Sequence, residues 1–217
     1  WKSVGCYQPH PIINVTKSIQ RPRRSKKLAE FIGIMMGDGG MSKRQISITL
    51  HHLDDRGYGK WVVKLVKELF GVTPSVYHVP KDSVNDIVVS RTELVQHLHT
   101  LGLPIGNKVK QQFDIPQWIK KNRRYRLACV RGLVDTDGSI FTHRYGVGGK
   151  RYHYKKLSFT SASKPLAVSV FTFFEEEGFH PRLSRDRDVW LDRIEDVRKY
   201  FAIVGSHNPK HLKRYHH

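Results

Sequence analysis

The sequence predicts an α+β fold made of two similar halves, each with helices packed on one side of an antiparallel sheet. A short motif occurs twice, as GIMMGDGG at residues 33–40 and as GLVDTDGS at residues 132–139, in one register 99 residues apart. Each copy is followed by the same order of elements, namely strand, helix, two strands and helix. The 217 residues suffice for two small fused units that each bury a modest core.

The repeated motif predicts a close pair of helices. Small residues recur four positions apart, at Gly33 and Gly37 in the first copy and at Gly132 and Thr136 in the second. This spacing places them on one helical face, and such faces let two helix backbones approach closely. These four residues are therefore the predicted helix interface.

Each predicted motif helix ends in aspartate followed by glycine. Asp38 precedes Gly39 and Asp137 precedes Gly138, and we expect both glycines to form left-handed helix caps. A carboxylate at a helix C-terminus is unfavourable, because that end carries partial negative charge. An unfavourable residue placed twice in one register points to a function for both aspartates.

The elements between the motifs follow from hydrophobic periodicity. Residues 45–51 alternate polar and apolar side chains, which predicts a half-buried strand. Apolar residues at helical spacing follow from Tyr58 to Leu69 and stop at Gly71. In the first half we further expect strands at residues 76–79 and 87–90 and a helix at residues 92–101. In the second half we expect strands at residues 157–160, 182–184 and 189–191 and helices at residues 165–177 and 194–204.

The second half contains an insertion. Ile46 and Leu157 are 111 residues apart although the motifs are 99 apart, so about 12 residues are added between Phe141 and Lys156. The turn sequence at residues 146–149 is rich in glycine and is flanked by basic and aromatic residues. The pattern predicts an elongated basic and aromatic hairpin.

The domain organisation follows from the repeat and from two runs of basic residues. We expect a basic N-terminal extension at residues 1–26, a first half at residues 27–115, a basic linker at residues 116–126 and a second half at residues 127–217. The linker is expected to pass over the surface. Basic runs of this kind either contact phosphates or are merely solvated, and the sequence favours neither.

Composition limits the class of protein. Lys and Arg number 38 against 19 Asp and Glu, which gives a net charge of +19 and points to a polyanion such as nucleic acid. Two cysteines exclude a disulfide framework and a cysteine-based zinc site. No apolar run approaches membrane-spanning length and no signal peptide is visible, so we expect a soluble, intracellular chain without a membrane partner.

The polar faces of the predicted sheets suit a DNA groove. Two-stranded β-ribbons fit the major groove, where polar and basic side chains contact base edges. Strand parity and nearby basic residues give the predicted DNA-binding set: Gln45, Ser47, Thr49, His51, Arg144, Arg151, Tyr152, Tyr154, Lys156, Ser158, Thr160, Arg182 and Arg185.

The motif aspartates suit phosphodiester hydrolysis. This reaction needs an activated water and stabilisation of a departing alkoxide, which a divalent metal provides. Asp38 and Asp137 are hard oxygen ligands of the kind that Mg²⁺ prefers, and DNA phosphates and water complete its coordination. Gly37 and Thr136 are further candidate metal ligands, and Ca²⁺ or Mn²⁺ is expected to substitute for Mg²⁺.

The doubled motif resembles the LAGLIDADG motif, whose nine letters align with Phe31–Gly39 and with Val130–Gly138. The chain is similar to single-chain, two-motif LAGLIDADG homing endonucleases. The resemblance implies two pseudo-symmetric αββαββα halves with paired motif helices at the interface and antiparallel sheets that form a DNA-binding saddle. It also implies a monomeric, intron-encoded enzyme that cuts both strands of DNA across the minor groove and leaves 3′ overhangs.

The resemblance implies a basic residue beside each active site, at Lys108 and Lys210. Both follow the helix after the fourth strand and are expected to stabilise charge in the transition state. The first copy departs from the motif at Met36 and Gly37 but keeps the acid at Asp38. In the second copy helical spacing turns Asp135 away from Asp137, so we interpret Asp135 as a cap or surface contact.

Three alternatives remain open. The first is an RNA maturase that assists intron splicing, because the basic surface suits RNA equally well. The second is a non-catalytic DNA-binding regulator on the same fold, although such a protein has no need for two acids near phosphates. The third is the endonuclease module of an intein, for which the sequence shows no splicing-domain termini.

Overall fold

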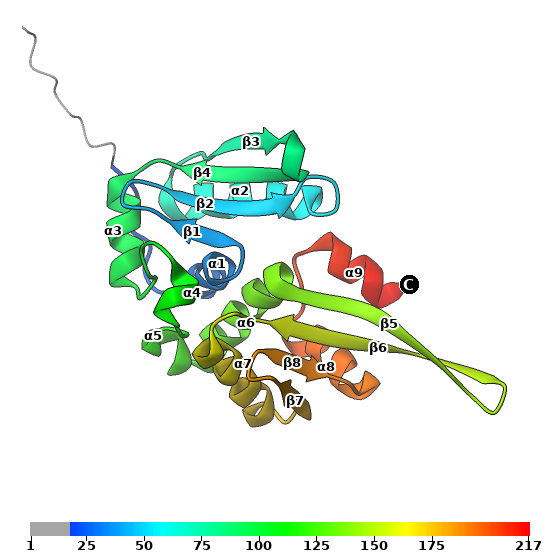
Figure 1. Ribbon diagram of the computed structural model, residues 1–217. Coiled ribbons are helices and arrows are strands. Elements are labelled where there is room, and N and C mark those ends of the chain that lie inside the picture. Colours follow the sequence, from blue (N-terminus) through cyan, green and yellow to red (C-terminus); the bar gives the residue numbers. More distant parts are fainter. Residues whose placement is uncertain (1–17) are drawn as a thin grey trace, which may run out of the picture.

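The computed structural model describes residues 18–217 and contains the two predicted halves, each with a four-stranded antiparallel sheet (Figure 1). The first half contains α1 (Lys26–Met36), β1 (Gly39–Met41), β2 (Ile46–His51), α2 (Arg56–Phe70), β3 (Ser75–Val79), the 3₁₀ helix η1 (Pro80–Asp82), β4 (Val84–Val89) and α3 (Thr92–Thr100). The connection contains α4 (Lys108–Gln111) and α5 (Gln117–Lys120). The second half contains α6 (Arg123–Asp137), β5 (Gly138–Val147), β6 (Lys150–Thr160), α7 (Lys164–Glu176), β7 (Pro181–Ser184), β8 (Asp188–Leu191), α8 (Ile194–Ile203) and α9 (Pro209–His216).

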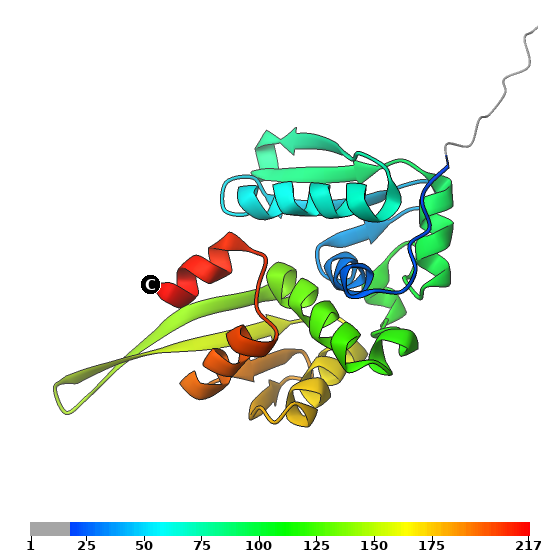
Figure 2. The same cartoon turned by 180° about the vertical axis from the view of Figure 1, so that it is seen from behind.

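The two sheets repeat one topology. Their strand orders are β1-β2-β4-β3 and β5-β6-β8-β7, which confirms the predicted internal repeat. Helices cover one face of each sheet and leave the other face open, as the two opposite views show (Figures 1 and 2). In β2 the apolar residues Ile46, Ile48 and Leu50 are buried against these helices, while Thr49 and His51 are exposed on the open face. The predicted parity of this strand is therefore confirmed.

The motif helices α1 and α6 pack backbone to backbone at the centre of the molecule. A Cβ atom on Gly33 would lie 2.2 Å from the carbonyl oxygen of Cys129, and one on Gly132 would lie 2.3 Å from that of Glu30. On Gly37 it would lie 2.0 Å from Thr136 Oγ1. Only small residues fit at these contacts, so the predicted helix interface is confirmed.

The expected left-handed caps at Gly39 and Gly138 are wrong. Gly138 has φ −94° and ψ 164°, Gly39 is not among the glycines with positive φ, and both glycines begin strands. Their lack of a side chain serves packing instead. A Cβ on Gly39 would lie 2.4 Å from the Cα of Met35, and one on Gly138 would lie 2.4 Å from Val134 O. Glycine thus allows the chain to pass from helix into strand at the end of each motif.

The predicted hairpin is present as β5 and β6, which pair from Gly138 to Val147 and project beyond the body of the second half (Figure 1). Val147 pairs with Lys150, so the turn consists of Gly148 and Gly149. Their φ values of 56° and 78° are in the left-handed region, which two-residue hairpin turns require and glycine adopts without strain.

The predicted linker does not simply pass over the surface. Residues 117–120 form α5, and α6 begins at Arg123. Ile119 is fully buried in the core that both halves share, which anchors the connection. Most of the predicted N-terminal extension, residues 1–17, lies outside the described residues. None of the described helices is long and apolar enough to cross a membrane.

Candidate active site and nucleic-acid interface

The two motif aspartates come together where α1 and α6 end. Asp137 is the last residue of α6, and Asp38 follows Gly37 at the C-terminus of α1. A Cβ atom on Gly37 would lie 3.4 Å from Asp137 Oδ2, so the Asp137 carboxylate lies against the end of the other helix. Both aspartates are only partly exposed. The close helix pair therefore brings two carboxylates into one partly buried site.

Burial and nearby negative charge disfavour the ionised forms of these carboxylates. Burial raises the pKa of Asp38 to about 6, although the ammonium group of Lys108 partly opposes the shift. Burial, followed by the negative charge of Asp38, raises the pKa of Asp137 to about 7. Two carboxylates that share a site are typical of catalytic or metal-binding centres, where a cation relieves the repulsion.

These shifts predict that the site destabilises the metal-free protein at high pH. Because the folded-state pKa values are raised, the stabilising contribution is fully present below pH about 4 and is lost as pH rises through 6 to 7. We expect Asp137→Asn to raise the free energy of unfolding by about 2–4 kcal/mol at pH 8, since one pKa unit corresponds to 1.36 kcal/mol. Thermal melts in EDTA at pH 5 and pH 8 test this, and a gain that is equal at both pH values would contradict it.

Lys108 caps the C-terminus of α1. Its Nζ atom donates to the carbonyl oxygens of Met36 at 3.0 Å and Gly39 at 2.6 Å, and also to that of Gly37. Burial lowers the pKa of Lys108, while the carboxylates of Asp137 and Asp38 favour its charged form. A positive charge is thereby fixed beside both aspartates at the negative end of a helix.

Lys210 makes a different contact from Lys108. Its Nζ atom lies 2.7 Å from Asp55 Oδ1 in the first half. Asn208, the N-cap of α9, donates from Nδ2 to the same Asp55 oxygen at 2.9 Å and to the carbonyl oxygen of Asp135 at 3.0 Å. Asp55 could not be assigned to this site from sequence patterns, because its partners lie more than 150 residues away in the chain.

Asp135 is not a surface contact, which corrects that part of our interpretation. It is buried, and its carboxylate accepts hydrogen bonds from Ser206 Oγ at 2.5 Å and from the backbone N–H of His207 at 2.7 Å. It is not a helix cap either, since it lies inside α6 and Asn208 is the N-cap of α9; its contacts fix the segment that leads into α9. Asp135 thus anchors the end of the chain to α6.

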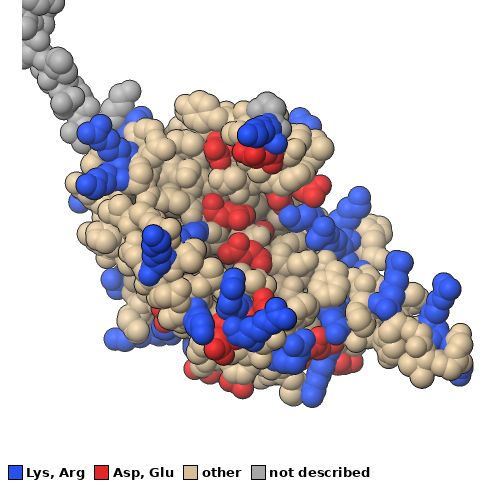
Figure 3. Space-filling view, viewed as in Figure 1, with Lys and Arg blue, Asp and Glu red and all other residues tan. Residues whose placement is uncertain are grey.

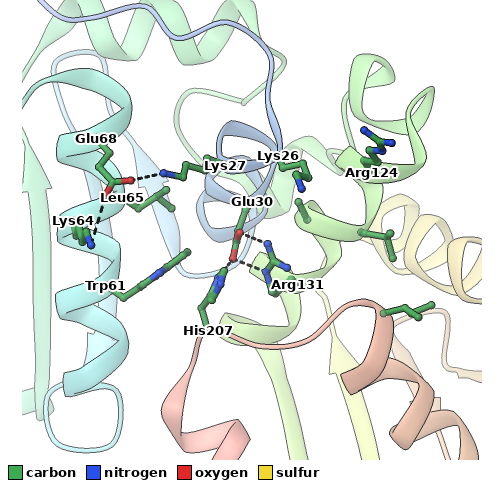
Figure 4. A pocket seen from close by; sticks show the side chains of 13 residues that line it. Lys26, Lys27, Glu30, Trp61, Lys64, Leu65, Glu68, Arg124, Arg131 and His207 are labelled. Atoms are coloured by element: carbon green, nitrogen blue, oxygen red, sulfur yellow. Dashed lines mark hydrogen bonds and ion pairs between the residues drawn. The ribbon is translucent and has the colours of Figure 1, made fainter.

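A second polar cluster lies in a cavity beside the two motif helices (Figure 4). Glu30, Asp135 and His207 have potential ligand atoms within 4.8 Å of one another. However, Arg131 donates to both Glu30 oxygens at 2.8 and 2.5 Å, and His207 Nδ1 lies 2.6 Å from Glu30 Oε1. Glu30 is already neutralised by these partners, so the cluster fits an ion-pair network that joins the halves better than a metal centre.

The donor set at the motif aspartates fits a divalent metal better. Asp38 and Asp137 offer two hard oxygen ligands without an ion-paired arginine, and a cation bound there would favour their ionised forms, which burial disfavours. The other two candidate ligands are less free. The Gly37 carbonyl oxygen accepts a hydrogen bond from Lys108. Thr136 Oγ1 donates to the carbonyl oxygens of Gly132 and Leu133, so the backbone carbonyl oxygen of Thr136 is the better candidate metal ligand of this residue.

The open faces of the sheets carry most of the predicted DNA-binding residues. Acidic side chains gather along the middle of this face and basic side chains border them, including along the hairpin (Figure 3). On the hairpin, the register places Tyr152 and Tyr154 on the same face as Ser158. Their rings pack with those of His143 and Tyr145 at centroid distances of 5.2–5.8 Å.

Two of the predicted DNA-binding residues do not lie on the open face of the sheet. Arg144 and Arg151 share the strand parity of the buried Leu157, so by register they lie on the opposite face of the hairpin from Tyr152 and Tyr154. Arg182 remains with the open face, since it pairs with Trp190, which pairs with Ser158, and its guanidinium lies over the Trp190 ring. Arg185 is in the turn after β7, with φ 55°.

A family model described as a LAGLIDADG-like domain matches residues 111–215, which include the second aspartate, the hairpin and Lys210. The second half of the chain therefore belongs to the LAGLIDADG-like domain family. The first motif helix and its sheet repeat the contacts and topology of the second half, so the other half has the same fold.

Solved structures share this LAGLIDADG fold. I-SmaMI bound to its uncleaved DNA target in the presence of calcium ions has a TM-score of 0.60 at 10% identity and covers 88% of both chains. I-DmoI in complex with DNA and Ca has a TM-score of 0.56 at 17% identity over 88% of this chain and 98% of that one. The I-LtrWI LAGLIDADG homing endonuclease bound to target DNA has a TM-score of 0.56 at 12% identity over 87% of both chains.

One curated relative is closer in sequence. The replication factor C small subunit of Methanocaldococcus jannaschii is 31% identical over 119 residues, which are 55% of this chain and 6% of that protein. The LAGLIDADG chain therefore corresponds to a small part of a much longer relative.

Proposed function

We propose that this LAGLIDADG protein is a site-specific, divalent-metal-dependent DNA endonuclease that makes double-strand breaks as a monomer. The observation that carries the proposal is the pair of partly buried aspartates, Asp38 and Asp137, at the convergent ends of α1 and α6. Two partly buried carboxylates with raised pKa values suit a site in which a bound cation favours their ionised forms. The net charge of +19 and the relatives bound to DNA support duplex DNA as the partner.

The chain's own residues account for binding and charge stabilisation. The open faces of the two sheets bind the two sides of the target, and the aspartates between them each serve one strand. A divalent metal at Asp38 and Asp137 would supply an activated water and a Lewis acid for the departing alkoxide. Lys108 and Lys210 place positive charge next to the scissile phosphates, where negative charge increases in the transition state.

Cleavage selection from a randomised duplex DNA library tests this function. With Mg²⁺ we expect recovery of one long target sequence, and with EDTA we expect none. Recovery of RNA rather than DNA ligands in a parallel binding selection would favour the RNA maturase. Sequence-specific DNA binding without cleavage under any divalent metal would favour the non-catalytic regulator.

The hairpin is expected to extend the target on one side only, because the equivalent pair of strands in the first half, β1 and β2, is much shorter. A strand gains about 3.3 Å per residue, so arms longer by about six residues reach several more base pairs of major groove. Replacing residues 144–155 by a short glycine-containing turn should relax sequence preference at one end of the target, while cleavage chemistry survives. Footprinting and repeated selection measure this effect.

The register of the hairpin sharpens this test. If the aromatic face contacts bases, Tyr152→Ala should relax preference at the same positions as the shortened hairpin. The neighbouring Arg151→Ala, on the opposite face, should weaken affinity without a change of preferred sequence. An unchanged, symmetric footprint for the shortened hairpin would show that the insertion is only a surface loop.

The match to a small part of a replication protein favours one of the alternatives, namely an endonuclease module carried within a longer protein. The proposal of DNA cleavage does not depend on this point. Both forms use the same helix pair, sheets and aspartates.

A further inference from the structure

Asp55 occupies the N-cap position of α2 but does not cap this helix. Aspartate is among the preferred N-cap residues because its carboxylate usually accepts a stabilising hydrogen bond from the first turn. Here the side chain makes no such bond. Its Oδ1 atom contacts Lys210 Nζ at 2.7 Å and Asn208 Nδ2 at 2.9 Å, and the side chain is only 10% exposed. The carboxylate is committed to the other half of the molecule.

The equivalent helix in the second half has no such carboxylate. Its N-cap is Ser163, whose Oγ donates to the carbonyl oxygen of Phe113 in the segment after α4. The Gln112 side chain accepts a hydrogen bond from the backbone N–H of Lys164 and donates one to the carbonyl oxygen of Ala162. The end of each half therefore docks on the helix N-terminus of the other half. The contact is neutral at α7 and charged at α2.

The charged contact lies beside Asp38. Asn208, two residues before Lys210, donates to the carbonyl oxygen of Asp135 near the end of α6, and Lys210 lines one cavity with Ser139, two residues after Asp137. In agreement with this placement, the positive charge of Lys210 lowers the pKa of Asp38 and the negative charge of Asp55 raises it. Lys108 favours the ionised forms of Asp38 and Asp137 alike. The two lysines are also held differently, Lys108 by carbonyl oxygens at the end of α1 and Lys210 by the carboxylate of Asp55.

We propose that Asp55 is a positioning residue that holds Lys210 beside Asp38 and thereby supports the cleavage of one DNA strand but not of the other. The physical reason is the flexibility of lysine, whose four-carbon side chain loses rotamer entropy when it is fixed. A buried carboxylate partner fixes the ammonium group before DNA binds. The inference rests on the proposed nuclease function and assigns a strand-specific role within it.

Single-turnover cleavage of the selected target, with a different label on each strand, tests the proposal. Asp55→Asn should slow one strand about 10- to 100-fold, as is typical when a partner that orients an active-site group is lost. This strand should be the one most slowed by Lys210→Met. The other strand should keep its rate, so that nicked DNA accumulates, and DNA affinity measured with Ca²⁺ should not change.

Two variants serve as controls. Asp55→Glu keeps the carboxylate and should restore most of the slowed rate. Ser163→Ala removes the neutral contact at the equivalent position and should leave the ratio of the two strand rates as in the wild type. If Asp55→Asn slows both strands alike, or slows neither, the positioning role is overturned while the nuclease function stands. A wild-type chain that cuts no DNA overturns both.

Discussion

Asp38→Asn and Asp137→Asn are each expected to remove double-strand cleavage while DNA binding persists. Asparagine keeps the size of the side chain but cannot supply the negative charge that a divalent metal requires. Loss of metal-based stabilisation of several kcal/mol corresponds to a rate at least about a thousandfold lower. The measurement is cleavage of the selected target with Mg²⁺, together with DNA affinity in Ca²⁺.

A nicked product from one of these single variants would indicate that each aspartate serves one strand. Asp54→Asn is the matched control, because Asp54 is an exposed acid next to α2 whose side chain is 61% accessible. It should cleave like the wild type. Loss of binding with unchanged residual cleavage in the two motif variants would contradict the assignment of these acids to metal rather than to DNA contacts.

Gly33→Val is expected to cost most of the folding stability. The first added carbon would lie 2.2 Å from the carbonyl oxygen of Cys129, which belongs to the backbone of α6 and cannot rotate away. The helices must separate, and the shared core loses its packing, so we expect a loss of about 3 kcal/mol or more in the free energy of unfolding. Chemical denaturation of wild type and variant measures this loss.

Gly59→Ala is the control for the glycine substitution. Gly59 is also inside a helix, α2, but a Cβ there would make ordinary contacts, 3.7 Å from Leu50 Cδ1 and 3.9 Å from Ile87 Cδ1. Alanine favours the helix by about 0.8–1.0 kcal/mol over glycine, so this variant should be slightly more stable than the wild type. A Gly33 variant of wild-type stability would show that the helix pair is more adaptable than its contacts imply.

Much of the fold and the central site could be predicted from the sequence, because the deciding signals are local and occur twice. Strand alternation at residues 45–51 and small residues four apart in each motif depend only on the geometry of single elements. The repetition linked Asp38 to Asp137 although 99 residues separate them. The glycine turn at residues 148–149 likewise follows from local backbone requirements.

The backbone conformation of the glycines at the ends of the two motifs could not be predicted in the same way. Gly39 and Gly138 suit a left-handed cap by residue type, yet each instead lets the chain enter a strand close to the preceding helical turn. A glycine in the sequence indicates that a side chain does not fit at that position, but it does not show which neighbouring atoms exclude the side chain. The buried role of Asp135 escaped prediction for a similar reason, because its partners Ser206 and His207 are about 70 residues away.

The two-half fold, the close helix pair and the candidate aspartates follow from the sequence alone, since periodic patterns and a doubled motif report on elements that form within short stretches of chain. The pairing of charged groups follows from the packing of the halves. Asp55 and Asn208 are 153 residues apart and contact each other because the end of the second half docks on α2. Pairing of polar groups over such distances depends on how the halves pack, which hydrophobic periodicity does not encode, and this packing makes the surroundings of Lys108 and Lys210 unequal.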